Sequence, residues 1–376
     1  MILLFLDMEE RITDRGTAAH SKKGRSNRNA AGTADEDPAA TPERRHMSLD
    51  HIVMPSMQMN HAPVFRPELA TGAPVYVIGG VNMDIAGTPA AELRCGDSNP
   101  GRVTLSPGGV GRNIAENLSR LGRRVSLITV LGDDAYAGAI REHCRNVGID
   151  LSMAFTDPLG RTSTYLCLNE QNGDLHAAVS DMAICEQLTP DRLKPILAKL
   201  NTGSFLIADA NLPEETLAWI AANITIPIAA DPVSAAKASR LKPILRRLTF
   251  LKPNLQEAEI LTGLTGGGAG SLTMLADALR ALGVSKVFLS LGGKGVWADD
   301  GKEGALLPCV PGTIVNTSGC GDAFVAAAAD ACLRGLGTMD CARRGLAAAA
   351  ICAEDPAPVS PKMTAEAIEM KLNMAQ

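Results

Sequence analysis

The sequence has 376 residues, of which 46% are hydrophobic and 20% charged, and this balance excludes a chain that is disordered over most of its length. A formal net charge of -5 gives no electrostatic reason for phosphate-backbone binding, so we expect a small-molecule ligand and no nucleic-acid partner. The nine cysteines form no C-x-x-C pair and mostly lie in apolar segments, which is typical of a protein in the reducing cytoplasm.

The first part of the chain, residues 1–72, is expected to be a flexible N-terminal extension. It is rich in Arg, Asn, Pro and Asp and has no lasting apolar periodicity, and Met47 within it is a candidate alternative start. The apolar residues 1–7 are too short to cross a bilayer and no later segment reads as a membrane span, so we expect no membrane partner. We therefore place the folded domain at residues 73–376.

The folded domain is predicted to begin with a buried strand at residues 75–78, which ends in two glycines and opens through a tight loop onto Asn82 and Asp84. After a glycine-rich segment, Ile114, Leu118 and Leu121 recur at helical spacing and predict a helix that Gly122 ends. A further buried strand is predicted at residues 124–131. The order strand, loop, helix, strand indicates an α/β fold with a parallel sheet and crossover helices.

The middle of the chain contains a hairpin signal. Two β-rich segments flank the turn sequence Gln-Asn-Gly-Asp at residues 171–174. Together with a strand near residue 102, this hairpin is expected to form a small β lid over the carboxyl edge of the sheet, contributed by about residues 95–106 and 162–180. The α/β alternation then resumes, with strands predicted at residues 205–208, 226–230, 248–252 and 286–291.

The most informative segment passes from an apolar run through Gly319, Cys320 and Gly321 to Asp322, with a helix of small residues predicted from near Ala323. Free N–H groups at the start of a helix, aided by the dipole, can bind a phosphate. A carboxylate beside them can accept the proton of an attacking hydroxyl, as an Asp does in other kinases. Taken alone, the segment is explained better by an Asp that only interacts with the helix dipole.

Together these segments resemble the ribokinase-like (PfkB) family of carbohydrate and nucleoside kinases, from residue 75 to about residue 367. Residues 108–113, GGVGRN, are similar to the N-terminal signature of the family, and residues 316–324, NTSGCGDAF, are similar to its C-terminal signature. The resemblance implies a three-layer α/β sandwich with a mainly parallel central sheet flanked by helices, plus a small β lid. It also implies an ATP-dependent phosphotransferase that acts on an alcohol group with the help of Mg²⁺.

Carried over position by position, the resemblance makes Asp322 the catalytic base and makes Gly319, Cys320 and Gly321 an anion hole. The contacts that it implies to substrate hydroxyls come from Asn82, Asp84, Gly108, Gly109 and Asn113. Amides and carboxylates can bind vicinal hydroxyls through paired hydrogen bonds, and a glycine pair lets backbone N–H groups do the same.

Two further segments resemble family motifs for the nucleotide and the metal. In residues 252–257, Asn254 and Glu257 would organise the water shell of Mg²⁺ beside ATP, although by sequence Asn254 is equally well an N-cap with Glu257 completing a capping box. The glycine-rich turn at residues 289–296 would approach ATP through Ser290, Gly292 and Gly295. The sequence contains no G-x-x-x-x-G-K-[ST] motif, so we expect ATP to be bound without a P-loop.

Within the family, residues 82–87, 97–101 and 106–113 resemble the pseudouridine kinases, which implies phosphorylation of the 5′-hydroxyl of pseudouridine. The expected additional contacts to the base and the ribose are Ser163, Asp181 and Asn211. Three alternatives stay open: a kinase of the same fold that acts on ribose, a hexose, adenosine or inosine; a dinucleotide-binding oxidoreductase; and a non-catalytic nucleoside or sugar sensor.

Two residues depart from the usual family pattern. Cys320 stands where Ala is usual, and its small side chain should be tolerated because the backbone N–H is the expected contact. Asn316 stands where Asp is common in related enzymes, which weakens the case for a monovalent cation beside Ser318 and leaves that cation as an option only. A homodimer formed through the lid is also left as an option.

Overall fold

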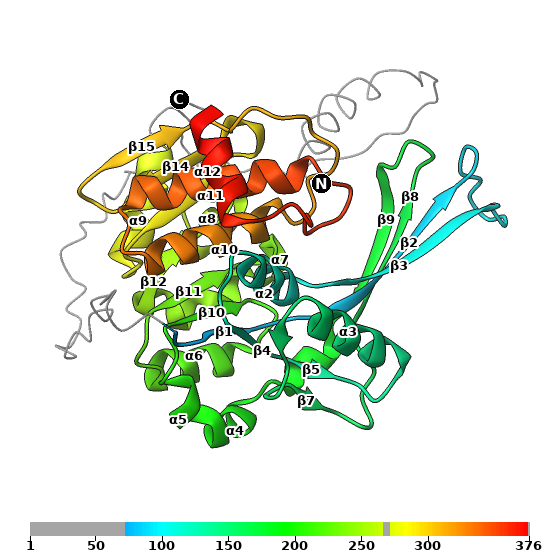
Figure 1. Ribbon diagram of the computed structural model, residues 1–376, viewed down its shortest axis with the longest axis horizontal. Helices are drawn as coiled ribbons and strands as arrows, with labels where there is room; N and C mark the ends of the chain where they lie inside the picture. The colour runs from blue at the N-terminus through cyan, green and yellow to red at the C-terminus, as the bar shows by residue number, and fades with distance from the viewer. Residues whose placement is uncertain (1–71, 266–270, 375–376) are drawn as a thin grey trace, which may run out of the picture. The chain divides into compact units, whose positions relative to one another are not determined.

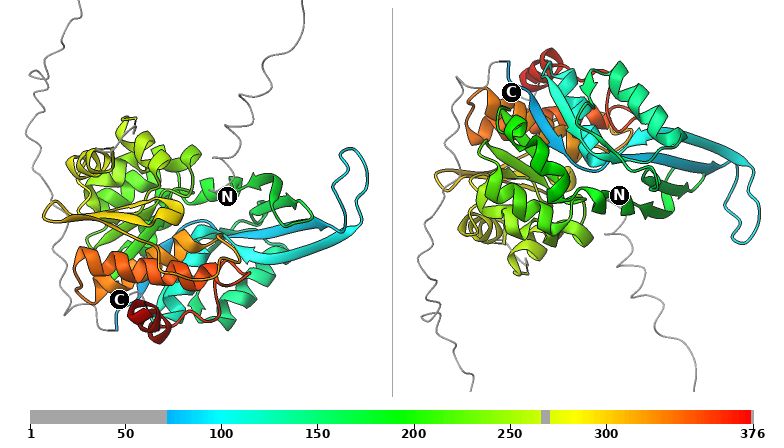
Figure 2. Two further views of the ribbon diagram at one scale, coloured as in Figure 1. Left: turned by 90° about the horizontal axis from the view of Figure 1, so that it is seen from above. Right: turned by 90° about the horizontal axis from the view of Figure 1, so that it is seen from below.

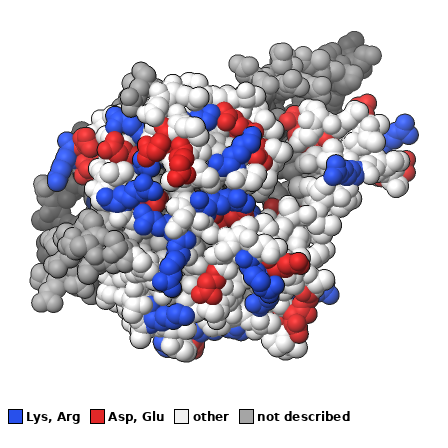
Figure 3. Space-filling model, viewed as in Figure 1, with Lys and Arg blue, Asp and Glu red and all other residues white. Residues whose placement is uncertain are grey.

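The computed structural model describes residues 72–265 and 271–374. All but the last residue of the predicted N-terminal extension therefore lies outside the described residues. Within the two described ranges, every helix is too short or too polar to cross a membrane. On the face shown in Figure 3, positive and negative side chains are intermingled.

A large sheet of nine strands forms the centre of the fold (Figure 1). All neighbouring strands from β6 to β13 pair in parallel, and β14 and β15 extend the sheet in antiparallel fashion. In sheet order the strands are β15 (Gly304–Leu307), β14 (Val296–Asp299), β13 (Val287–Ser290), β12 (Leu248–Leu251), β11 (Ile228–Asp231), β10 (Phe205–Asp209), β1 (Val75–Ile78), β4 (Val125–Ile128) and β6 (Ile149–Asp150).

Helices cover both faces of the large sheet (Figure 2) because its strands are apolar on both sides. In β1, Tyr76 and Ile78 pack into one core while Val75 and Val77 pack into the other. The first core is closed by α6 (Glu214–Asn223), α8 (Leu255–Thr262) and α9 (Ser271–Ala281). The second is closed by α2 (Val110–Arg120), α3 (Ala135–Asn146), α10 (Cys320–Leu333) and α11 (Thr338–Ala353). The predicted three-layer α/β fold class is thus confirmed.

Several smaller elements complete this body. The strands β5 (Val130–Leu131) and β7 (Phe155–Thr156) form a separate parallel pair. Three short helices, α4 (Pro190–Leu193), α5 (Leu197–Leu200) and α7 (Ala235–Ala238), also contribute to the first core, and a further helix is α12 (Ala365–Met374). The last of these packs through Ile368 against the small residues of α11.

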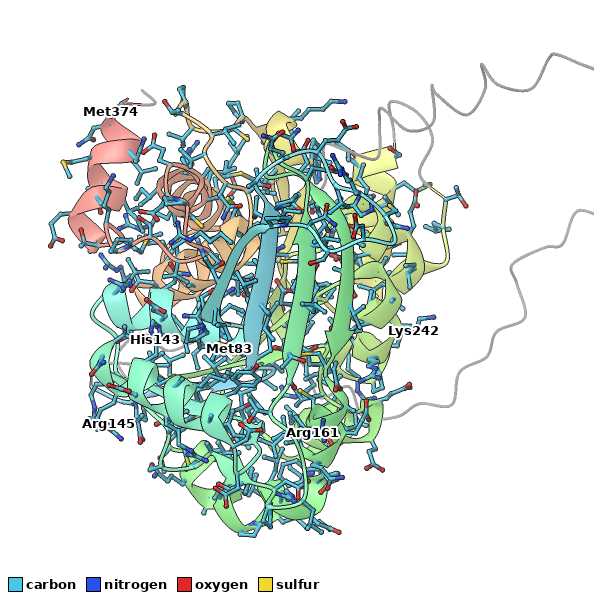
Figure 4. The ribbon with its side chains drawn as sticks, turned by 90° about the vertical axis from the view of Figure 1, so that its right-hand side faces the viewer. Met83, His143, Arg145, Arg161, Lys242 and Met374 are labelled. Carbon is cyan, nitrogen blue, oxygen red and sulfur yellow. The ribbon has the colours of Figure 1, made fainter. Side chains whose placement is uncertain are left out.

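A second sheet of four strands, which we call the lid, projects from the large sheet (Figures 1 and 4). Its strands, in sheet order, are β3 (Gly101–Gly108), β2 (Asn82–Pro89), β8 (Thr164–Asn169) and β9 (Leu175–Asp181). The predicted hairpin is present as β8 and β9. Met83, labelled in Figure 4, is buried in the second core, so this end of β2 lies close to the large sheet.

Three sequence predictions need correction. Asn82 and Asp84 lie on a strand and not in a loop, because β2 continues the chain of β1 into the lid and pairs there with both β3 and β8. The helix α2 begins at Val110, four residues earlier than predicted. The helix α10 begins at Cys320, so Gly321 and Asp322 belong to its first turn.

Candidate functional site

The carboxyl ends of the parallel strands bring polar side chains to one edge of the large sheet. Asp209 ends β10, Asp231 ends β11, and Lys252 directly follows β12. All three are buried. Ligands of open α/β sheets bind at this edge, so the site is expected here.

The start of α10 provides a cradle of unpaired backbone donors. Gly319 has a φ of 81° and a Cβ on it would lie 1.9 Å from the carbonyl oxygen of Pro358, so only glycine fits. Among the described residues, the N–H groups of Gly319, Gly321 and Asp322 donate no hydrogen bond, whereas that of Cys320 makes a long one of 3.4 Å to the oxygen of Thr317. Such free donors at a helix start can hold a phosphate.

Asp322 lies in the first turn of α10 and is only 8% exposed. Its Oδ2 accepts a hydrogen bond of 2.7 Å from Nδ2 of Asn113. Burial, together with the nearby charge of Asp231, raises the pKa of Asp322 to about 8, against the opposing effects of Asn113, Lys252 and Arg112. A carboxyl group whose pKa lies close to neutral pH is suited to accept and release a proton.

Asn113 is held in a fixed orientation by a neighbour that the sequence did not reveal. The fully buried guanidinium of Arg112 donates to Oδ1 of Asn113 and to Oε2 of Glu116. Nε2 of His143, on α3, lies 2.8 Å from the same Glu116 oxygen. Because its Oδ1 is occupied by Arg112, the amide of Asn113 must direct its Nδ2 towards Asp322. Arg112 therefore orients the partner of the carboxylate.

The residues expected to bind hydroxyl groups lie together at the base of the lid, where β2 begins and β3 ends. Nδ2 of Asn82 donates to Oδ1 of Asp84 at 2.5 Å. A Cβ on Gly108 would lie 2.2 Å from Oδ2 of Asp84, and a Cβ on Gly109, whose φ is 98°, would lie 2.6 Å from the oxygen of Gly80. The structure thus brings Asn82, Asp84 and the two glycines together.

Arg112 also links this group to Asp322. Burial raises the pKa of Asp84, while the hydrogen bond from Asn82 and the charge of Arg112 act in the opposite direction. The same guanidinium acts on the pKa of Asp322. The buried charge of Arg112 therefore acts on the carboxyl groups of both Asp84 and Asp322.

Of the three residues expected to contact the base or the ribose, two lie at the foot of the lid. Asn211 is 3% exposed, and a Cβ on Gly80 would lie 2.6 Å from its Nδ2. Ser163 is buried, and its carbonyl oxygen accepts the N–H of Met83 at 2.9 Å. Asp181 is exposed at the end of β9, where its carboxylate accepts the N–H of Ala183 at 3.3 Å and contacts no other predicted site residue among those described.

The Asn254 and Glu257 pair forms a complete capping box at the start of α8. Oδ1 of Asn254 accepts the N–H of Glu257 at 2.8 Å, and Oε2 of Glu257 accepts the N–H of Asn254 at 2.9 Å. This leaves Oε1 of the buried Glu257 without a hydrogen bond from the described residues. In the described part of the chain, no group of three or more His, Cys, Asp or Glu side chains could cage a metal. One free carboxylate oxygen fits a hydrated Mg²⁺ whose other ligands are phosphate and water.

The glycine-rich turn between β13 and β14 lies against the same segment. The N–H of Ser290 donates to the oxygen of Pro253 at 2.9 Å, and Ser290 forms an isolated bridge with Asn254. Gly295 has a φ of 100°, and a Cβ on it would lie 2.0 Å from the oxygen of Leu307. In the same turn, the oxygen of Gly292 accepts from the thiol of Cys309 at 3.4 Å.

Hydrogen bonds of Asn316 connect the loop before α10 to the segment that follows α11. Nδ2 of Asn316 donates to the oxygen of Pro356 at 2.9 Å and its Oδ1 accepts the N–H of Ser318 at 3.0 Å, so this side chain fixes the loop itself. A cavity of about 920 Å³ lies between the residues Pro356 and Ala357 and the outer part of β2 and β3. The lid therefore stands over an open space beside the cradle.

Sequence reasoning missed Asp209, Asp231, Lys252 and the structural role of Arg112. Asp209 accepts the N–H of Gly80 at 2.8 Å, and Asp231 lies 3.7 Å from Nζ of Lys252. Asp209 and Asp231 each end a buried strand as its one polar residue, and Lys252 directly follows a third, and that pattern was the available signal. Arg112 gave no comparable signal, because a charged residue in a helix is usually exposed.

Comparisons with known proteins identify the family and the fold. A family model described as "pfkB family carbohydrate kinase" matches residues 73–365. The pseudouridine kinase of Escherichia coli (strain K12) is 35% identical over 70% of this chain and 84% of its own length. The uncharacterized sugar kinase YeiI of the same strain is 35% identical over 77% of this chain and 81% of its own. Among solved structures, a carbohydrate kinase from Agrobacterium tumefaciens superposes with a TM-score of 0.72 at 33% identity, covering 81% of this chain and 98% of the other.

Proposed function

The chain belongs to the pfkB family of carbohydrate kinases, and on that premise we propose that it transfers the γ-phosphoryl group of ATP to the 5′-hydroxyl of pseudouridine. The observation that carries the proposed site is the 2.7 Å contact between Asn113 and Asp322. It joins the residues expected to bind hydroxyl groups to the carboxylate beside the phosphate cradle. An acceptor held by Asn82, Asp84 and Asn113 would then lie next to Asp322.

In the proposed reaction, the 5′-oxygen of the nucleoside forms a bond to the γ-phosphorus while the bond from that phosphorus to the β–γ bridging oxygen breaks. The hydroxyl proton passes to Asp322, and the electron pair of the broken bond leaves with ADP. The free N–H groups of Gly319 and Gly321 stabilise the charge on the phosphoryl oxygens. Catalysis then depends mainly on positioning and charge stabilisation.

Kinases of this family use ATP, typically with Mg²⁺. When bound, that ion supplies positive charge for the phosphate oxygens. We assign its water shell to Asn254 and Glu257, because Oε1 of Glu257 is free and the adjoining Ser290 turn lies beside it. The nucleotide would lie along Ser290, Gly292 and Gly295.

The substrate is proposed from the relatives and from the foot of the lid. The pseudouridine kinase and YeiI are equally similar in identity, so another nucleoside or a sugar is the alternative. Nδ2 of Asn211 lies beside Gly80, close to the proposed acceptor site, and supports a ribose contact. Asp181, exposed at the end of β9, has no supporting contact among the described residues and stays a prediction from the sequence alone.

Incubation of the protein with ATP, Mg²⁺ and a panel of nucleosides and sugars tests the proposal, with formation of ADP and of the phosphorylated product as the readouts. Pseudouridine should give the highest kcat/KM, and Asp322→Asn should lower turnover by about 10²-fold or more. Preference for ribose, a hexose, adenosine or inosine would overturn the substrate assignment. Nucleoside binding with no turnover by the wild type would favour the sensor.

We also infer that a second copy of the chain covers one face of the lid. Cross-strand pairing places Leu105, Ile85, Leu166 and Val179 in one row. Leu105, Leu166 and Val179 are 56%, 50% and 66% exposed, so an apolar row of the lid faces solvent. The row that contains Asp84 alternates with it and lies on the opposite face, towards the proposed acceptor.

A self-complementary apolar face is what a two-fold homodimer buries. Light scattering after gel filtration should therefore give twice the chain mass, and Leu105→Glu should give the monomer. Leu159→Glu is the matched control, because Leu159 is 96% exposed and is not part of a lid strand. A wild type that is monomeric at all concentrations would refute the dimer and leave the kinase assignment intact.

A further inference from the structure

Lys252 is a buried cation, and the charges of Asp231, Glu257 and Asp322 raise its pKa although burial acts in the opposite direction. It directly follows β12 and is 8% exposed. Among the described residues it makes one salt bridge, in which its Nζ lies 3.7 Å from Oδ2 of Asp231. That distance is longer than an N–H···O hydrogen bond. The nearby carboxyl groups keep the ammonium charged, but among the described residues none accepts a hydrogen bond from it, so its donors are available to a ligand.

The ammonium faces the start of α10. A Cβ placed on Gly321 would lie 3.1 Å from Nζ of Lys252, so the side chain ends beside the first turn of that helix. The N–H of Gly321 donates no hydrogen bond among the described residues. A charged donor and free backbone donors therefore border the same small space. A side chain larger than hydrogen at position 321 would fill part of that space.

The positive charge also lies between two carboxyl groups of the proposed site. The charge of Lys252 opposes the rise in the pKa of Asp322 and the rise in the pKa of Glu257, both of which are caused first by burial. Lys252 thus lies at the point where the proposed base, the proposed metal motif and the phosphate cradle meet.

We propose that Lys252 is a further catalytic residue, whose ammonium group binds an oxygen of the γ-phosphoryl group of ATP together with the N–H groups at the start of α10. The inference rests on the proposed reaction site and is independent of which acceptor is used. As the phosphorus moves from the bridging oxygen to the acceptor oxygen, Lys252 keeps its proton and neutralises charge on a non-bridging oxygen. The hydroxyl proton still passes to Asp322.

The competing explanation is structural: Lys252 neutralises the buried Asp231 and contacts no substrate. The two explanations differ in whether the affinity depends on the γ-phosphate. A structural lysine affects ADP and a non-hydrolysable ATP analogue alike. A lysine that binds the γ-phosphoryl group affects the ATP analogue alone.

The experiment measures the affinity of the full-length protein for ADP and for AMPPNP by calorimetry in the presence of Mg²⁺. The variants are Lys252→Met and Lys252→Arg. Lys286→Met is the matched control, because Lys286 is also partly buried but its Nζ contacts the backbone oxygen of Leu336 and no predicted site residue. Lys252→Met should weaken AMPPNP binding by about 10- to 100-fold and change ADP binding by less than about 2-fold. Lys252→Arg should retain part of the AMPPNP affinity, and Lys286→Met should retain all of it.

Turnover gives the second readout. Lys252→Met should lower kcat by about 10²-fold or more with little change in the KM of the acceptor. Lys252→Met leaves the buried Asp231 without a counter-charge, so near-ultraviolet circular dichroism is used to check that this variant is folded. If it unfolds, the double variant Lys252→Met with Asp231→Asn, which removes both charges, is tested in its place. An unchanged preference for AMPPNP over ADP, or equal losses for both, would overturn the proposal. Since binding requires no acceptor, failure on pseudouridine would leave this test intact.

Discussion

Replacement of Asp322 by Asn is expected to stabilise the protein while it removes the proposed base. Asp322 is 8% exposed, and its neighbours include the like-charged Asp231. The amide that replaces the carboxylate keeps an oxygen that can accept the hydrogen bond from Nδ2 of Asn113, which in the wild type is 2.7 Å long. The substitution therefore removes a buried charge and preserves the shape of the site.

The sign and size of the effect follow from the raised pKa of Asp322. Between pH 3.8 and about 8 the folded protein holds a proton on this carboxyl group that the unfolded chain has released, so the free energy of unfolding falls as the pH rises through this window. A rise of about 4 pKa units corresponds to on the order of 5 kcal/mol. Loss of the attraction to Lys252 offsets part of this, and we expect a net gain of about 1–3 kcal/mol at pH 8.

Urea unfolding of both proteins at pH 5, 7, 8 and 9 measures this gain. The difference between Asp322→Asn and wild type should grow with pH and level off above about pH 8. Asp330→Asn, on the same helix, is the matched control: Asp330 is 1% exposed and accepts from Nε of Arg123 and of Arg334 at 2.7 and 2.8 Å, so its loss should destabilise the protein. A difference that does not depend on pH would refute the account of Asp322.

Three further outcomes follow from the same contacts. The kcat/KM for the acceptor should rise about tenfold per pH unit and level off near pH 8, because Asp322, whose pKa is raised to about 8, must lose its proton to act as base; a flat profile between pH 6 and 9 would contradict this. Glu257→Gln should raise the Mg²⁺ concentration for half-maximal activity by about tenfold or more, measured by titration at fixed ATP, and an unchanged Mg²⁺ requirement would remove Glu257 from the metal site. Asp84→Asn should raise the KM of the acceptor by about 10- to 100-fold with the KM of ATP unchanged, and equal effects on both would place Asp84 outside the acceptor site.

Much of the fold could be predicted because its signals are local. The strand at Val75–Ile78 is a run of β-branched and aromatic residues that is followed by two glycines, and the hairpin of β8 and β9 surrounds a strong turn sequence. The strand β2 gave no such signal, since its sequence NMDIAGTP contains Gly and Pro. It is held in the sheet by pairing with β3 and β8, which is a non-local effect.

The site was predictable to the extent that short motifs encode it. Gly319 and Asp322 lie within one motif, and the φ of 81° at Gly319 favours glycine there through local backbone geometry. Asp231 and Lys252 could not be placed in the same way, because they meet only after β11 and β12 pair in parallel. Nor could the sequence show that Arg112 orients Asn113, since this depends on how two side chains of α2 are buried against α10.

A structure of the protein with pseudouridine and a non-hydrolysable ATP analogue tests the central claim most directly. The account predicts that the 5′-oxygen lies about 2.6–3.2 Å from the carboxylate of Asp322, with the γ-phosphate at the N–H groups of Gly319 and Gly321. A nucleoside whose 5′-oxygen points away from Asp322, or a γ-phosphate bound away from the start of α10, would contradict it.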